Sequence, residues 1–102
     1  KEDKSRLFEV FYGELKAAPL IRACPLNIEC KLVQTIDLPT NTLFIGEIMN
    51  IYSEDKYLEN GKPDVKKIRP FLLTMPDNRF WSVGEQVGNA WKDGVAYKKQ
   101  MK

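Results

Sequence analysis

One segment, residues 42–52, restricts the fold more than any other part of the sequence. It predicts a long strand, and strand alternation divides its large side chains between two faces. One face carries Leu43, Ile45, Met49 and Ile51, and the other carries Phe44, Ile48 and Tyr52. An antiparallel strand that is apolar on both faces belongs in a barrel or beneath a partner. Gly46 lies inside this strand and indicates close approach of another backbone or of a ligand.

The preceding residues predict the other strand of an antiparallel hairpin. From Leu26 to Leu32, apolar residues alternate with polar ones, as in a strand with one buried face. The alternation shifts by one residue near Leu32 and Val33, where we expect a β-bulge. Residues 37–41 predict the turn that joins this strand to residues 42–52.

The segments on either side predict shorter elements. Apolar residues at helical spacing predict a helix from Ser5 to Leu15. Three connectors are expected after the long strand: a helical turn capped by Ser53, a turn at Asn60 and Gly61, and a short helix capped by Asp64.

Beyond Pro70 we expect a second hairpin, with strands at 71–75 and 79–83. Val83, Val87 and Trp91 recur every four residues and predict a short helix. The tail from residue 92 onward carries four lysines against one aspartate, which predicts a solvated or frayed terminus. The predicted fold class is therefore mainly antiparallel β with flanking helices.

The composition restricts domain number and chemistry. A chain of 102 residues and 11.8 kDa fits one domain or a piece of one, and we expect residues 1–102 to form a single domain. It does not begin with methionine, so we expect a fragment of a longer protein. The absence of histidine from the sequence excludes Ser-His-Asp and Cys-His catalysis and histidine-ligated zinc or haem.

The charge balance and the apolar runs bear on partners and location. A net charge of +2 is too small to indicate nucleic acid or an anionic membrane as partner. The sequence has no apolar run of the roughly 18 to 20 residues that a membrane helix needs. Cys24 and Cys30 would lie about 20 Å apart on an extended chain, beyond the roughly 7 Å limit for a disulfide. We expect two reduced cysteines in a cytoplasmic protein.

Each candidate site residue has a simpler structural explanation beside the functional one. Glu29 and Glu47, on opposite strands of the hairpin, form either an acid-base pair or solvent-facing partners for Lys31. Glu54, Asp55 and Glu59 lack the spacing of a calcium loop, so we expect no metal site. Trp81 and Trp91 either stack on a planar ligand or pack in the core.

Five segments, taken in order, resemble the flavin reductase-like proteins and most of all their flavoredoxin branch. They are residues 3–5 (DKS), 24–30 (CPLNIEC), 41–47 (NTLFIGE), 60–64 (NGKPD) and 80–88 (FWSVGEQVG). The resemblance covers only the C-terminal half of that family. It implies a split β-barrel that binds FMN, usually as a homodimer, and carries hydride or electrons through the flavin. Asn41 stands where many relatives have a histidine.

The resemblance also implies site residues and partners. Asp3 and Lys4 match the stretch that runs near the flavin, and Trp81 is a candidate wall of the site. The expected partners are a second copy or the missing N-terminal half, together with NAD(P)H or a redox protein. The alternative function is a non-catalytic dimerisation or binding module that keeps the barrel framework without a flavin.

Overall fold

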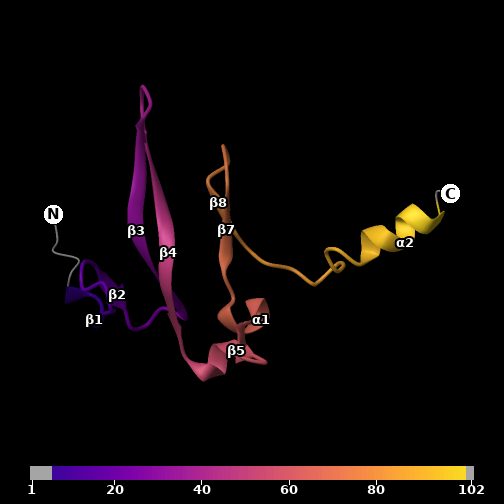
Figure 1. The fold of residues 1–102 in the computed structure, drawn as a ribbon, viewed down its shortest axis with the longest axis horizontal. Helices are drawn as coiled ribbons and strands as arrows, with labels where there is room; N and C mark the ends of the chain where they lie inside the picture. The colour runs from indigo at the N-terminus through magenta and orange to yellow at the C-terminus, as the bar shows by residue number, and fades with distance from the viewer. Residues whose placement is uncertain (1–5, 101–102) are drawn as a thin grey trace. The chain divides into compact units, whose positions relative to one another are not determined.

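The computed structural model describes residues 6–100 and divides the chain into two compact units, one before and one after the boundary between Ile68 and Arg69. Both units are built on antiparallel hairpins, so the predicted fold class is confirmed (Figure 1). The first unit contains β1 (Val10–Tyr12), β2 (Pro19–Ile21), β3 (Leu26–Asp37), β4 (Thr42–Ser53), a 3-10 helix η2 (Asp55–Tyr57), β5 (Leu58–Glu59), β6 (Lys62–Pro63) and α1 (Val65–Ile68). The second contains β7 (Phe71–Thr74), β8 (Arg79–Ser82) and α2 (Asp93–Gln100). That residues 1–102 form a single domain stays a prediction.

The predicted hairpin is confirmed as the long pair β3–β4, with 12 residues in each strand. Its turn is closed by the backbone N–H of Leu38, which donates to the carbonyl oxygen of Asn41 at 2.8 Å. The predicted bulge is also confirmed, because Val33 is inserted between the pairs Leu32–Gly46 and Gln34–Ile45. At Gly46 an added Cβ would lie 3.1 Å from the Cβ of Cys30, so the close approach there comes from the neighbouring strand.

A second register shift, which we did not predict, changes the faces of β4. Met49 is inserted between the pairs Cys30–Ile48 and Glu29–Asn50. Because directly opposed residues share a face of the sheet, the shift places Ile51 on the side of Ile48 and places Tyr52 on the opposite side. The prediction that Ile51 shares a face with Leu43, and Tyr52 with Phe44, was therefore wrong.

The two shifts give the hairpin two chemically different faces. The apolar face carries Ile28, Cys30, Leu32, Phe44, Ile48 and Ile51. The polar face, at the end remote from the turn, carries Asn27, Glu29, Asn50 and Tyr52. The polar residues are thus collected on one side of a strand pair that is otherwise rich in large hydrophobic side chains.

The predicted helix from Ser5 to Leu15 was wrong over its described part, because residues 10–12 form β1 and pair with β2. Valine, phenylalanine and tyrosine favour strands over helices, and Gly13 follows them directly. The ladder is extended by the backbone N–H of Arg22, which donates to the carbonyl oxygen of Glu9 at 2.9 Å. The apolar residues 7, 8, 11 and 15 have the spacing of one helix face, but this spacing does not by itself form a helix.

The three predicted connectors are present, the first as the helical turn η2, but one predicted cap was wrong. Asn60 and Gly61 have φ of 53° and 75° and make the turn between β5 and β6. Asp64 caps α1, since its carboxylate accepts a hydrogen bond of 3.1 Å from the backbone N–H of Lys67. Ser53 does not cap η2; its hydroxyl instead donates to the carbonyl oxygen of Pro25 at 2.8 Å.

In the second unit, the predicted hairpin is confirmed as β7–β8. The helix predicted from Val83 to Trp91 was wrong, because residues 83–89 adopt no regular secondary structure and Gly84 and Gly88 weaken any helix there by about 1 kcal/mol each. The tail is not frayed over its described residues, since residues 93–100 form α2. Its first turn is held by the Asp93 carboxylate, which accepts from the backbone N–H of Asn89 at 3.1 Å.

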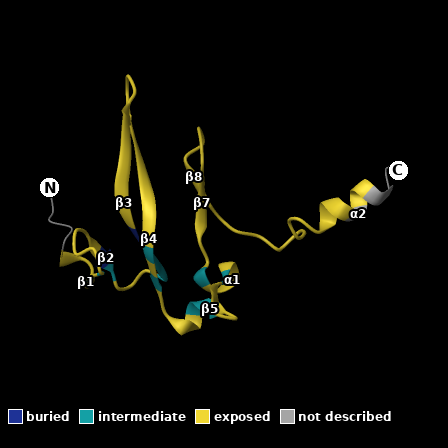
Figure 2. Ribbon diagram, in the orientation of Figure 1, coloured by how far each residue is buried: buried dark blue, intermediate teal, exposed yellow. Residues whose placement is uncertain are grey.

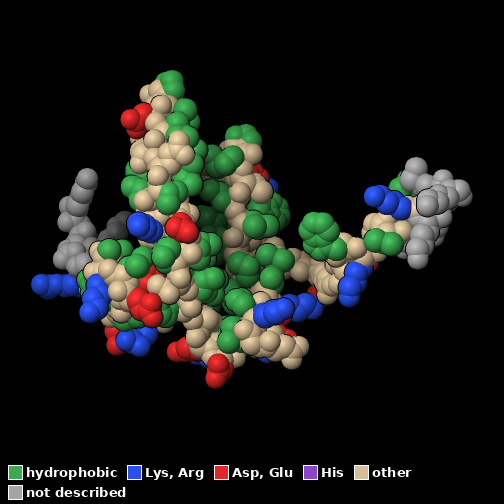
Figure 3. All heavy atoms as spheres, viewed as in Figure 1, with side chains coloured by type: hydrophobic (Ala, Val, Ile, Leu, Met, Phe, Trp, Pro, Cys, Tyr) green, Lys and Arg blue, Asp and Glu red, His purple; other side chains and the backbone are tan. Residues whose placement is uncertain are grey.

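Large hydrophobic side chains of the β3–β4 hairpin are exposed (Figures 2 and 3). Their exposed fractions range from 36% to 67%, in Ile28, Leu32, Val33, Ile36, Leu43, Phe44, Ile45, Ile48, Met49 and Ile51. Complete burial of such a side chain stabilises the folded state by about 1.5 to 3 kcal/mol. Because these ten side chains are about half exposed, roughly 10 kcal/mol of that stabilisation is missing. That is comparable to the whole net stability of a domain, about 5 to 15 kcal/mol. Cover for both faces therefore has to come from outside the hairpin.

Candidate functional site

The polar face of β3–β4 holds a buried carboxylate. Glu29 is only 4% exposed, and its Oε1 accepts hydrogen bonds from Asn50 Nδ2 at 3.0 Å and from the Tyr52 hydroxyl at 3.3 Å. Its Oε2 is buried and makes no hydrogen bond within the described part of the chain. The prediction that Glu29 faces solvent was wrong, because its side chain is buried. Glu47 is exposed and stands opposite Lys31, as predicted for it.

The loop that follows β1 lies on this carboxylate. A Cβ added at Gly13 would stand 2.6 Å from Glu29 Oε2 and 2.6 Å from the Tyr52 hydroxyl. The backbone N–H of Glu14 donates to the same hydroxyl at 3.0 Å. Only a residue without a side chain fits against the carboxylate, so Gly13 is required by close approach.

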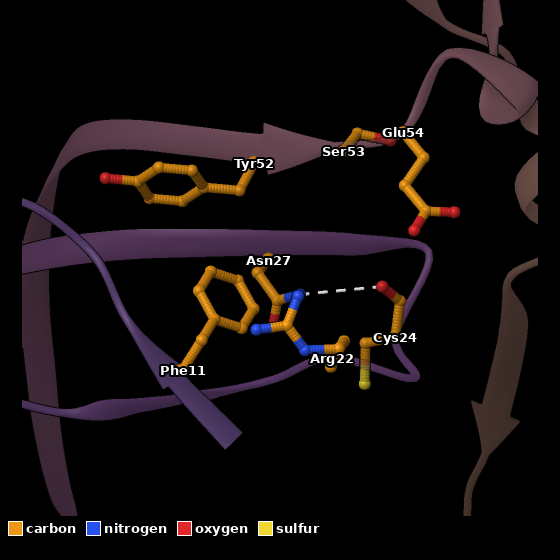
Figure 4. A pocket seen from close by; sticks show the side chains of 7 residues that line it. All are labelled: Phe11, Arg22, Cys24, Asn27, Tyr52, Ser53 and Glu54. Atoms are coloured by element: carbon orange, nitrogen blue, oxygen red, sulfur yellow. Dashed lines mark hydrogen bonds between the residues drawn. The ribbon is translucent and has the colours of Figure 1, made fainter. Parts of the chain in front are cut away.

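A second polar group, Asn27, joins β2 to β3. Its Oδ1 accepts from the backbone N–H of Ile21 at 3.1 Å, and its Nδ2 donates to the carbonyl oxygen of Ile21 at 2.9 Å. The same Nδ2 lies 3.5 Å from the carbonyl oxygen of Cys24 (Figure 4). The Asn27 side-chain amide therefore bonds both the N–H and the carbonyl oxygen of Ile21, as a paired strand residue would.

A small open pocket of about 100 Å³ lies beside these groups (Figure 4). It is lined by Phe11, Arg22, Cys24, Asn27, Tyr52, Ser53 and Glu54. The Phe11 and Tyr52 rings meet edge to face with centroids 5.9 Å apart, and the Arg22 guanidinium lies 5.3 Å from the Phe11 centroid. Pockets that enclose cofactors measure roughly 300 to 1,000 Å³, so a flavin does not fit here.

Of the predicted site residues, Asp3 and Lys4 lie outside the described residues. Trp81 lies in β8, opposite Leu72, while its neighbour Phe80 lies on the other face opposite Leu73. The Trp81 ring is 48% exposed. Its indole N–H donates to Thr74 Oγ1 at 2.8 Å, and that hydroxyl donates to Asp77 Oδ1 at 2.7 Å. Trp81 is therefore held in place with about half of its surface open.

Ion pairs join several charged side chains of the described residues. Arg22 lies 3.1 Å from Glu9, Lys56 lies 3.3 Å from Glu54, Lys67 lies 2.6 Å from Glu59 and Arg79 lies 3.8 Å from Asp77. The hydrogen bond that Lys56 donates to Glu54 raises the pKa of Lys56 above its usual value, with the nearby Tyr57 as a further cause. These groups are largely exposed, so such pairs contribute little to stability.

Within residues 6–100, His, Cys, Asp and Glu side chains form no cluster that could hold a metal ion. Both cysteines are free thiols. Over the same residues, we find no helix with the length and apolar character needed to cross a bilayer.

Sequence reasoning missed the cluster of Gly13, Glu29, Asn50 and Tyr52. The available signal was Asn50, a polar residue between Met49 and Ile51 in a strand that is mostly apolar. Its place beside Glu29 becomes predictable only once the shift at Met49 brings the two residues opposite each other.

Comparisons with known proteins agree with this architecture. The sequence profile of the flavin reductase like domain matches residues 1–76. A crystal structure of flavoredoxin from Methanosarcina acetivorans is 59% identical, with a TM-score of 0.89 over 95% of this chain and 52% of the other. Flavoredoxin of Desulfovibrio vulgaris is 32% identical, with a TM-score of 0.78 over 88% of this chain and 48% of the other. An uncharacterised protein of Archaeoglobus fulgidus is 34% identical over 64% of this chain and 37% of its own length.

The chain thus spans about half the length of the flavoredoxins and just over a third of the Archaeoglobus protein. The antiparallel hairpins and these structural matches fit the expected split-barrel fold. That the matching part is the C-terminal half stays a prediction. The matched profile covers well over half of the chain, and the chain belongs to the flavin reductase-like family, in its flavoredoxin branch.

Proposed function

We propose that this chain is part of an FMN-binding oxidoreductase or electron-transfer protein. The observation that carries the proposal is the likeness to the Methanosarcina flavoredoxin over 95% of the chain at 59% identity. Bound FMN would supply the redox chemistry by accepting a hydride at N5 and passing electrons onward, while the protein supplies position and electrostatics. NAD(P)H or a redox protein is the proposed electron partner.

Within this chain, Trp81 is the residue best suited to a flavin site. Its indole N–H is already satisfied by Thr74, so its contribution would be the open ring face rather than a hydrogen bond. Stacking on such a face contributes on the order of 1 kcal/mol. The family resemblance adds Asp3 and Lys4 to the proposed site.

The remaining contacts have to come from residues outside β3–β4 and β7–β8. The pocket of about 100 Å³ is too small for the flavin ring. A missing N-terminal half or a second copy would supply these contacts. The same partner would cover the apolar face of β3–β4, whose unburied side chains make association favourable.

The small pocket also favours a second candidate function. A non-catalytic dimerisation or binding module would use the same apolar face without any flavin. The two functions differ in their response to FMN.

An FMN titration, followed by quenching of flavin fluorescence, separates these functions when the full-length protein and residues 1–102 are compared. We expect micromolar or tighter binding by the full-length protein and weak or no binding by the segment. Micromolar affinity requires about 8 kcal/mol, far above the contribution of one or two stacked rings. No binding by the full-length protein would favour the non-catalytic module. Submicromolar binding by residues 1–102 alone would refute the proposal that part of the FMN site lies outside them.

A further inference from the structure

The buried carboxylate of Glu29 has no part in the proposed redox chemistry. Removing a carboxylate from water lowers the stability of the folded state unless its oxygens are hydrogen-bonded. A carboxylate that is 4% exposed normally has each oxygen paired. Here Oε1 receives two donors, whereas Oε2 receives none from the described residues and lies against Gly13. Among residues 6–100, Glu29 contacts Asn50, Tyr52 and the loop after β1.

A ligand for the open oxygen does not explain this arrangement. Oε2 is buried, and the backbone of Gly13 closes the space beside it so tightly that a Cβ would already collide. The pocket nearby is lined by Tyr52 but not by Glu29. The carboxylate is therefore internal to the chain, and its effect has to pass through its neighbours.

Those neighbours lead to the N-terminal hairpin. Glu29 Oε1 accepts from the Tyr52 hydroxyl, and that hydroxyl accepts from the backbone N–H of Glu14. Asn50 holds Oε1 from the other side. Glu29 and the Glu14 amide are thus connected through the Tyr52 hydroxyl. This connection holds the loop over residues 13–16 on the polar face.

We infer that Glu29 is a positioning residue that holds the loop after β1 on the polar face of β3–β4, and that flavin binding depends on this contact. This inference rests on the proposed function in its last step, because Asp3 and Lys4 come shortly before β1 in the chain. The contact between Glu29 and the loop does not depend on that step.

The chemistry of the contact predicts which substitutions are tolerated. Glutamine at position 29 keeps an oxygen that can accept from both Asn50 and Tyr52, whereas alanine removes the acceptor. Tyr52→Phe breaks the connection to Glu14 and leaves the bond between Glu29 and Asn50 in place. Glu47→Ala is the matched control, since Glu47 lies in the same hairpin, is exposed and stands opposite Lys31.

The test uses the full-length protein with two local readouts and one functional readout. The local readouts are hydrogen exchange of the Glu14 amide and trypsin cleavage after Lys16, both compared with amides of β7–β8 as a reference for global opening. We expect Glu29→Ala and Tyr52→Phe to raise both local rates about tenfold or more, and Glu29→Gln and Glu47→Ala to change them less than about threefold. Because Tyr52→Phe keeps the carboxylate and its amide partner, it tests the contact even if Glu29→Ala does not fold.

The functional readout is FMN affinity. If the inference is right, affinity falls about tenfold in Glu29→Ala and Tyr52→Phe and returns in Glu29→Gln. The inference is overturned if Glu29→Gln lowers FMN affinity as much as Glu29→Ala does. It is also overturned if Tyr52→Phe leaves both local rates unchanged. If the unsubstituted protein binds no FMN, the proposed function and the flavin step fail together, while the two local rates still decide whether Glu29 positions the loop.

Discussion

Gly13→Ala is the substitution whose outcome the structure specifies most sharply. The new Cβ would stand 2.6 Å from Glu29 Oε2, 2.6 Å from the Tyr52 hydroxyl and 2.8 Å from Glu29 Oε1. Separations below 3.0 Å require one of these groups to move. Glu29 is buried and held by Asn50 and Tyr52, so it moves only if the hydrogen bonds to Oε1 are lost.

The cost has two parts. Overpacking of a filled site costs about 1 to 3 kcal/mol. Weakening the hydrogen bonds to a buried carboxylate adds about 1 to 3 kcal/mol. We therefore expect the free energy of unfolding to fall by about 2 to 6 kcal/mol.

Chemical denaturation of the full-length protein measures this loss. Gly84→Ala is the control, because a Cβ there meets nothing within 4 Å and should change stability by no more than about 0.5 kcal/mol. In a Glu29→Ala background, Gly13→Ala should cost at least about 1 kcal/mol less than alone, since two of the three collisions are removed. A loss below about 0.5 kcal/mol, or the same loss in both backgrounds, would refute the reasoning.

Two further predictions concern the apolar side chains. Ile45→Lys and Ile48→Lys, made separately, test the two faces of β4, because burial of an unpaired charge costs several kcal/mol. We expect each variant to lose folding or assembly. A variant that stays folded, with its size unchanged by light scattering, would show that its face is open to water. Trp81→Ala should weaken FMN binding by about 1 to 2 kcal/mol with a similar or smaller loss of stability, since the ring is 48% exposed. A stability loss of about 3 to 5 kcal/mol with unchanged FMN affinity would instead assign Trp81 to the core.

Local patterns in the sequence were sufficient for the hairpins. Alternation over residues 26–32 and the break at Val33 predicted β3 and its bulge, because each depends on neighbours within one strand. Asn60 and Gly61 predicted their turn by their tolerance of positive φ, which is a property of the residues themselves.

The errors arose where distant residues decide the outcome. Residues 10–12 form a strand because residues 19–21 pair with them, and helical spacing does not report that pairing. The burial of Glu29 depends on a register shift in β4, 20 residues further along the chain at Met49. The helix predicted at 83–91 rested on three apolar residues and neglected the two glycines between them. Trp81 was correctly placed on the face opposite Phe80, because alternation within one short strand is local.

We propose that these residues are part of a flavin-carrying protein. The visible absorption spectrum of the full-length protein after gel filtration tests this, with the released flavin identified and quantified after acid precipitation. We expect a yellow protein that carries FMN at close to one flavin per chain, either as purified or after incubation with excess FMN. A folded protein that stays colourless after that incubation and releases no flavin would contradict it.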